Sequence, residues 1–152
     1  MNEEQVTPQH LWDLYNIPVN NTHEFLFELG FVFHQKIENL SLYIAHGRSF
    51  VLTEKDGFTT KVQFNLTDEA IFNECIDYAM DALAFETIYE EFGTAVDVLR
   101  LDNTTCSLVC MAVHSENSRL SFNITLLAKL AVPTTESKIE IRLTPLPLLN
   151  EN

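Results

Sequence analysis

Glycine is scarce in this sequence of 152 residues, which has only Gly30, Gly47, Gly57 and Gly93. Loops that cradle phosphates need several glycines at fixed spacing, because only a residue without a side chain lets the backbone approach a phosphate closely. Neither a P-loop nor a G-x-G-x-x-G motif is present, and H-E-x-x-H, C-x-x-C and G-x-S-x-G are also absent. We therefore expect no catalytic, cofactor-binding or metal-binding residues, and a protein that is not an enzyme.

Cysteine is also rare, and the three residues Cys75, Cys106 and Cys110 are an odd number. If positions 106 and 110 share a strand, their Cα atoms lie roughly 13 Å apart at about 3.3 Å per residue, which is too far for a disulfide. Buried free thiols in a reducing cytoplasm are the expected state. Five Asn-x-Ser/Thr triplets, at Asn20, Asn39, Asn65, Asn103 and Asn123, would matter only on a secreted chain.

The sequence has no long apolar run and no charged start followed by an apolar segment. A membrane-spanning helix needs about 20 apolar residues. We therefore expect neither a membrane span nor a signal peptide, and a cytoplasmic protein.

Positive charge is absent from the middle of the chain, where no Lys or Arg occurs between Lys61 and Arg100. The whole chain has a net charge of −13, which disfavours direct binding to nucleic acid or to an anionic membrane. Nine acids lie in this gap: Asp68, Glu69, Glu74, Asp77, Asp81, Glu86, Glu90, Glu91 and Asp97. They form either a solvated surface or a docking surface for a basic partner.

The same stretch predicts one long acidic helix, at about residues 68–92. Thr67 is a suitable N-cap, Asp68 and Glu69 suit the positive end of the helix dipole, and Gly93 suits the position after the helix end. No Pro or Gly interrupts it, and Ala, Leu, Met and Glu are frequent. The apolar stripe changes direction near residues 80–82, so either one helix changes its packing neighbours there or two helices meet.

The rest of the chain predicts short helices at residues 8–17 and 21–29, followed by strands. Period-two alternation indicates strands at residues 31–36, 40–45, 50–52 and 58–65 before the long helix. Further strands are expected at 96–101, 106–113, 120–128 and 138–143, and the strand at 106–113 is apolar on both faces, as a central strand is. Asp56-Gly57 is a hairpin signal.

This order predicts an α+β fold in which antiparallel strands form two sets around the long acidic helix. We expect one domain over residues 1–152, with an N-terminal helical arm at 1–20 and a C-terminal tail at 145–152.

The expected function is protein interaction, as an inhibitor, chaperone or adaptor that docks on a basic surface of a protein partner, such as a nucleic-acid-handling protein. The candidate partner-binding residues are Glu74, Asp77, Asp81 and Glu91 for attraction, Ala84 and Ile88 as an apolar patch, and Trp12 as a second anchor.

Two alternatives stay open. One is a structural subunit of a larger complex, and the other is a small-ligand-binding or enzymatic domain with a pocket between sheet and helix. If a homodimer forms, we expect it on the helix or on the Trp12 arm, because Lys138, Glu140 and Arg142 would hinder pairing at the 138–143 strand.

Overall fold

The computed structural model describes residues 6–114 and 119–129. Its helices are α1 (Pro8–Asn16), the 3-10 turn η1 (Val19–Asn21), α2 (Thr22–Glu28) and α3 (Glu69–Ala82). Its strands are β1 (Val32–Ile37), β2 (Leu40–Ala45), β3 (Arg48–Lys55), β4 (Phe58–Leu66), β5 (Glu86–Phe92), β6 (Val96–Asp102), β7 (Cys106–His114) and β8 (Arg119–Ala128). In this part of the chain, no helix has the length and apolar character that a membrane span requires.

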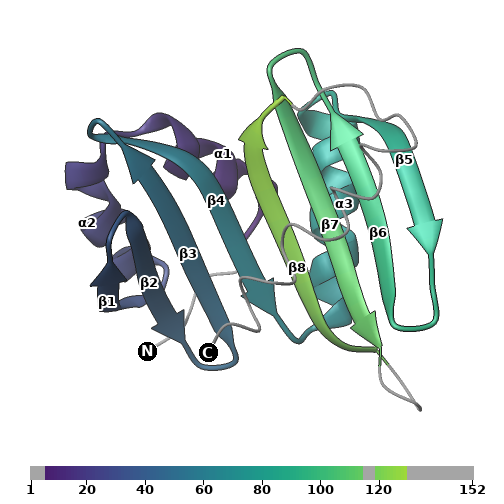
Figure 1. The fold of residues 1–152 in the computed structure, drawn as a ribbon, viewed down its shortest axis with the longest axis horizontal. Helices are drawn as coiled ribbons and strands as arrows, with labels where there is room; N and C mark the ends of the chain where they lie inside the picture. Colours follow the sequence, from purple (N-terminus) through teal and green to yellow (C-terminus); the bar gives the residue numbers. More distant parts are fainter. Residues whose placement is uncertain (1–5, 115–118, 130–152) are drawn as a thin grey trace.

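The strands form one antiparallel sheet of eight, in the order β1-β2-β3-β4-β8-β7-β6-β5. The two four-stranded meanders join where β4 pairs with β8. All three α-helices lie on one face of this sheet, as Figure 1 shows, and we call this the helix face. On it α1 packs on β4 and β8, α3 packs on β8 and against α1, and α2 contacts β1.

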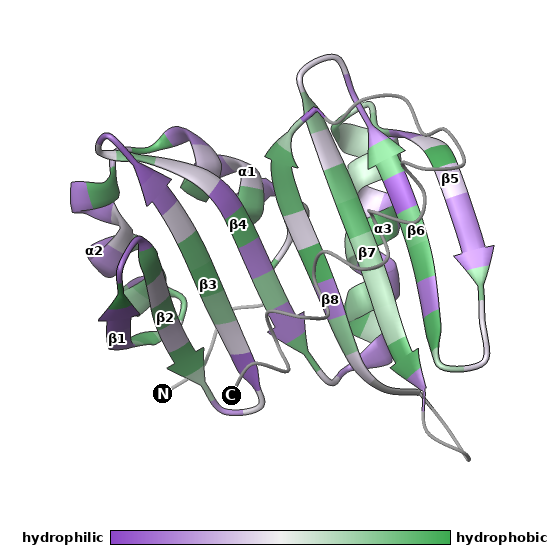
Figure 2. Ribbon diagram, in the orientation of Figure 1, coloured by the Kyte–Doolittle hydropathy of each residue, from purple (hydrophilic) through white to green (hydrophobic). Residues whose placement is uncertain are grey.

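Cross-strand pairing assigns each residue to the helix face or to the opposite, second face. One helix-face row runs through Tyr43, Phe50, Phe64, Ile124, Cys110, Leu99 and Glu90. The neighbouring second-face row runs through Ile44, Ser49, Asn65, Asn123, Met111, Val98 and Glu91. The apolar character of the first row explains why the helices pack on that face. Figure 2 shows hydrophobic and hydrophilic residues alternating along strands such as β3 and β4.

The main core lies between the helices and the sheet and is rich in aromatic rings. Phe50 stacks on Phe64 with ring centroids 4.8 Å apart, and Phe31 meets Phe50 edge-on at 4.9 Å. Phe72 of α3 packs on Phe122 of β8 at 4.6 Å, which fixes the helix on the sheet. Burying each such ring contributes about 1.5–3 kcal/mol relative to leaving it exposed.

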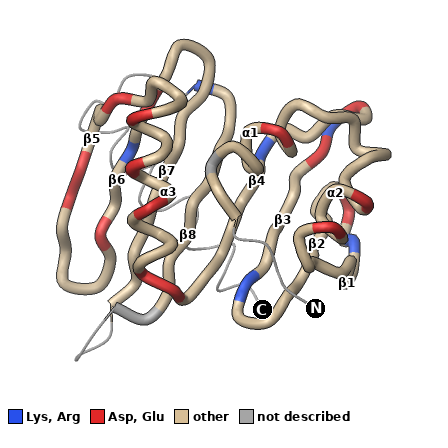
Figure 3. Tube along the Cα trace, turned by 180° about the vertical axis from the view of Figure 1, so that it is seen from behind, with Lys and Arg blue, Asp and Glu red and all other residues tan. Residues whose placement is uncertain are grey.

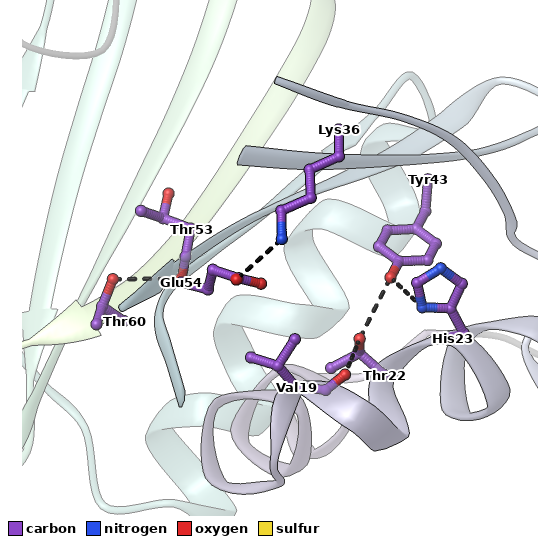
Figure 4. Close-up of polar contacts among 8 residues, drawn as sticks. All are labelled: Val19, Thr22, His23, Lys36, Tyr43, Thr53, Glu54 and Thr60. Atoms are coloured by element: carbon purple, nitrogen blue, oxygen red, sulfur yellow. Dashed lines mark hydrogen bonds and ion pairs between the residues drawn. The ribbon is translucent and has the colours of Figure 1, made fainter. Parts of the chain in front are cut away.

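Two separate sets of polar contacts hold α2 and the edge strand β1 on the sheet (Figure 4). The buried Tyr43 hydroxyl is hydrogen-bonded to Thr22 Oγ1 at 3.2 Å and to His23 Nδ1 at 3.0 Å. Thr22 in turn donates to the carbonyl of Val19 at 2.8 Å. Lys36 on β1 reaches across β2 to Glu54 on β3 with an ion pair of 3.0 Å.

The predicted fold class is wrong, because the chain has one continuous sheet and a helix of 14 residues rather than two strand sets around a helix at 68–92. The cap is Asp68, whose side chain accepts from the Ile71 N–H, and not Thr67. The helix ends at Ala82, and Ala84 then takes a left-handed conformation with φ 61°. The left-handed residue that follows a helix is usually Gly. Because Ala stands at position 84, the sequence did not indicate that the helix ends here.

The second half of the predicted helix is strand β5. It carries β-branched and aromatic residues at Thr87, Ile88, Tyr89 and Phe92, which suit a strand. The change in direction of the apolar stripe near residues 80–82 therefore reflects the change from helix to strand. Both predictions for it, one helix with changing neighbours and two helices that meet, were wrong. Gly93 lies in the β5–β6 hairpin, where a Cβ atom would come within 2.8 Å of the Val96 carbonyl oxygen.

Other local predictions are confirmed. Thr7 precedes α1 with Pro8 in its first turn, and the Thr7 N–H donates to His10 Nδ1 at 3.0 Å. Asp56 and Gly57 form the β3–β4 turn, both with positive φ. β7 is central, between β6 and β8, with buried residues on both faces. The predicted strand at 138–143 and the tail at 145–152 lie outside the described residues.

Candidate partner-binding groove

The structure places three of the predicted acids together. Glu74, Asp77 and Asp81 are exposed on the solvent side of α3, whose opposite side buries Phe72 and Cys75. Acids at such spacing on a helix are surface neighbours. They form a continuous negative strip along α3.

The remaining predicted residues do not all join this strip. Ala84 is exposed in the turn after α3, and Ile88 is exposed in the β5 bulge. Glu91 lies on the second face, where it pairs with Val98 and accepts a hydrogen bond from the Tyr89 hydroxyl. The sheet therefore separates Glu91 from the strip.

Trp12 lies on α1 and packs partly buried against the protein's own core. Its ring meets Phe85 edge-on, with the centroids 6.4 Å apart. Phe85 follows the turn at Ala84, so Trp12 helps to hold the junction between α3 and β5.

An apolar pocket opens beside the strip, between α3 and the strands β5–β7. It encloses about 180 Å³. We call it the α3–β5 groove; its lining is Phe72, Asn73, Ile76, Phe92, Asp97, Val98, Leu99, Cys110 and Ala112. The groove exists because α3 packs on β8, toward the middle of the sheet, so that among the described elements no helix lies over the edge strand β5 (Figure 1).

Phe92 is the most exposed large apolar residue in the described chain, at 72 %. It stands at the end of β5, opposite Asp97, and lines the groove. Because water contact with an exposed aromatic ring is unfavourable, such a residue beside a pocket is typical of a contact surface.

Acids surround the groove on both sides. On α3, Glu69 and Asp77 lie four residues before and after the groove residue Asn73, so they share its side of the helix. On the sheet, Glu90 pairs with the groove residue Leu99 on the helix face. Figure 3 shows acidic segments along both α3 and β5.

Among the residues that line the groove, the acidic one is Asp97. Its carboxylate lies 2.9 Å from His114 Nε2 and accepts the Gly93 N–H at 3.2 Å. These contacts fix the end of the β5–β6 hairpin and thus the position of Phe92.

In the part of the chain that the structure describes, no Lys or Arg offsets this charge on the two elements that border the groove. α3 and β5 both fall in the stretch without Lys or Arg. Arg100 of β6 is fully buried on the second face, where its Nε and terminal nitrogen donate to the Asp102 carboxylate at 2.9 and 2.7 Å. The described elements that border the groove therefore carry a net negative charge, and such charge attracts cationic groups.

The Arg100–Asp102 pair was not recognised from the sequence. Burial raises the pKa of Asp102, but hydrogen bonds from Arg100 and Ser107 and the charge of Arg100 lower it more, so the pKa lies below its ordinary value. The sequence feature that could have indicated this ion pair is the strand-like alternation in residues 96–102, which puts positions 100 and 102 on one face of the strand. The pair is part of the second-face core beside Val98, Val109 and Met111.

The expectation of buried free thiols is confirmed. Cys75, Cys106 and Cys110 are all buried and unbonded. Burial raises the pKa of the Cys75 thiol to about 12, and it raises the pKa of Cys110 on the groove floor as well. These thiols act as apolar packing groups.

The described part of the chain contains no group of three or more His, Cys, Asp or Glu side chains arranged to hold a metal ion. Comparison with protein-family models, with curated proteins and with solved structures found no match to this chain.

Proposed function

We propose that this chain is a non-enzymatic binding protein that takes a basic segment of a protein partner into the α3–β5 groove. The observation that carries the proposal is the exposed Phe92 at an apolar pocket that acids border on both sides. Apolar contact supplies affinity in this arrangement, and charge supplies attraction and selectivity.

The size of the groove favours an inserted side chain over a free small molecule. Pockets for drug-sized ligands usually enclose about 300–1,000 Å³. The α3–β5 groove, at about 180 Å³, is smaller and suits one large apolar side chain presented by a polypeptide.

The acids define the chemistry of the partner. Asp77 lies one helical turn from the groove residue Asn73, and Glu90 pairs with the groove residue Leu99. Glu74 and Asp81 extend the negative strip along α3. A partner with Lys or Arg on both sides of an apolar residue fits this pattern. A basic surface of a nucleic-acid-handling protein, which this chain would block or chaperone, has this composition.

Free, buried thiols support an intracellular site of action, because structural cysteines persist unpaired in reducing compartments. A role as a permanent subunit of a larger complex would use the same groove and would differ in the lifetime of the contact.

The test is site-specific photo-crosslinking in the native host. Phe92 is replaced by a photoreactive phenylalanine analogue, and the matched control carries the same analogue at Phe27. Phe27 lies on α2 and is similarly exposed at 70 %.

We expect the Phe92 position to capture a discrete protein, with the crosslink inside a segment that carries Lys or Arg and an apolar residue. The Phe27 position should not capture it. Capture at both positions, or a crosslinked segment without basic residues, would contradict the proposal.

A further inference from the structure

The edge strand β1 carries an apolar surface that no described element covers. All six of its residues are exposed, with Val32 at 56 % and Ile37 at 57 %. Their cross-strand partners on β2, Ile44 and Leu40, are exposed as well. An edge strand also presents unpaired backbone N–H and C=O groups, so it can add another strand.

A bulge in β1 puts both of its apolar residues on the same face. Val32 and Ile37 are five positions apart, which would place them on opposite faces of a regular strand. The register shifts between Phe33 and Gln35, so Val32 pairs with Ile44 and Ile37 pairs with Leu40. Ile44 and Leu40 are four positions apart on a regular strand, and all four side chains therefore share the second face.

This spacing makes β1 self-complementary. We propose that β1 pairs antiparallel with β1 of a second copy of this chain, about a two-fold axis between His34 and Gln35. Val32 then lies opposite Ile37 of the second copy, and Phe33 lies opposite Lys36 of the second copy. One apolar row then crosses the contact, in the order Leu40 and Ile37 of one copy, then Val32 and Ile44 of the other. The two-fold symmetry creates a second, identical row.

Charge distinguishes this edge from the other edge of the sheet. Residues 29–53 contain Lys36, Arg48 and Glu38, a net charge of +1 from two bases and one acid, in a chain of −13. Lys36 is already paired with Glu54. At the opposite edge, β5 carries Glu86, Glu90 and Glu91 in seven residues, and like charges hinder strand pairing.

The sheet order reinforces this choice. β1 and β5 are the first and last strands of the described sheet. Pairing through β1 therefore keeps the two acidic α3–β5 regions at the far ends of the dimer and leaves both grooves open. The inference does not depend on what the groove binds.

The contact is small, since six residues pair on each side. Interfaces below about 1,200 Å² are typical of weak association, so we expect a dimer with a dissociation constant in the range of about 1–100 µM. The test is sedimentation equilibrium of the full chain across this range of concentrations.

Two exposed-site variants test the register. In a homodimer of Val32→Lys, the new lysine of each copy faces Ile37 of the other copy; in a homodimer of Ile37→Glu, each new glutamate faces Val32. Each variant therefore has two charges opposite apolar residues and should associate at least about tenfold more weakly. In a mixture of the two, the introduced lysine faces the introduced glutamate at one position, while the other position keeps its native Ile37–Val32 contact. The mixture should recover association to within about threefold of the unaltered chain.

Ile88→Lys, at the β5 edge, is the matched control and should leave association unchanged. Circular dichroism confirms that each variant is folded before it is compared. A chain that stays monomeric at all concentrations, a dimer lost with Ile88→Lys, or single variants that do not recover on mixing would each overturn the proposal.

Discussion

The buried Arg100–Asp102 pair should be the most sensitive single site for stability. Arg100 has no solvent exposure, and two of its nitrogens donate to the two oxygens of Asp102 at 2.9 and 2.7 Å. Asp102→Asn keeps the shape of the side chain and removes its charge, so the bidentate acceptor of a buried guanidinium is lost.

The magnitude follows from the cost of breaking a buried ion pair, about 3–5 kcal/mol. This is a large share of the free energy of unfolding of a domain, about 5–15 kcal/mol. At about 2–4 °C per kcal/mol for a chain of this size, the melting temperature should fall by about 6–20 °C.

The control removes both charges. Arg100→Met with Asp102→Leu leaves no charge without its partner, and replacing a buried pair by apolar residues is often neutral or stabilising. The double variant should therefore be more stable than Asp102→Asn. Urea denaturation monitored by circular dichroism measures the three free energies of unfolding.

The effect should also depend on pH in a defined direction. The pKa of Asp102 is lowered in the folded protein, so its stabilising contribution is complete above the ordinary pKa of 3.8 and is lost as the pH falls through the folded pKa. The difference between native chain and Asp102→Asn should therefore be full at pH 7 and shrink below about pH 4. A difference under about 1 kcal/mol at pH 7, or a double variant as unstable as Asp102→Asn, would refute the reasoning.

Two further predictions concern the helix end and the thiols. Ala84→Gly should raise the free energy of unfolding by about 1 kcal/mol, because glycine adopts the left-handed conformation of φ 61° without a Cβ clash; a thermal melt showing lower stability would contradict this. The thiols of Cys75, Cys106 and Cys110 should react with a chromogenic disulfide reagent only after unfolding, since all three are buried and the pKa of Cys75 is raised to about 12. Rapid labelling of the folded chain at pH 8 would count against this packing.

Local sequence rules predicted most strands but not the fold class. Alternation and turn residues such as Asp56-Gly57 are local signals, and they located the β3–β4 hairpin. They missed the β5–β6 hairpin, because its first strand was predicted as helix. The segment Glu86–Phe92 combines three glutamates, which favour helix, with β-branched and aromatic residues, which favour strand. Its pairing with β6 decides between the two. Local preference was therefore divided in this segment, and no glycine stands at the end of α3 to separate helix from strand.

The candidate site was predictable only in its charge. The stretch without Lys or Arg identified Glu74, Asp77 and Asp81 from the sequence. The groove joins α3 to Phe92, Leu99 and Cys110, and this contact depends on the order of strands in the sheet. Glu91 lies apart from these acids because the segment is a strand, in which successive residues point to opposite faces of the sheet.

The most direct test of the α3–β5 groove is the affinity of the partner captured at Phe92, measured by calorimetry over a series of salt concentrations. Asp77→Lys with Glu90→Lys reverses the charge on both sides of the groove. Glu24→Lys with Glu28→Lys on α2 changes the net charge of the chain equally and is the control. The account predicts that the groove variant binds at least about tenfold more weakly, with a flatter dependence on salt, while the control stays within about twofold of the native chain. Equal losses in both variants, or an unchanged affinity and salt slope in the groove variant, would contradict a groove that recognises a basic segment.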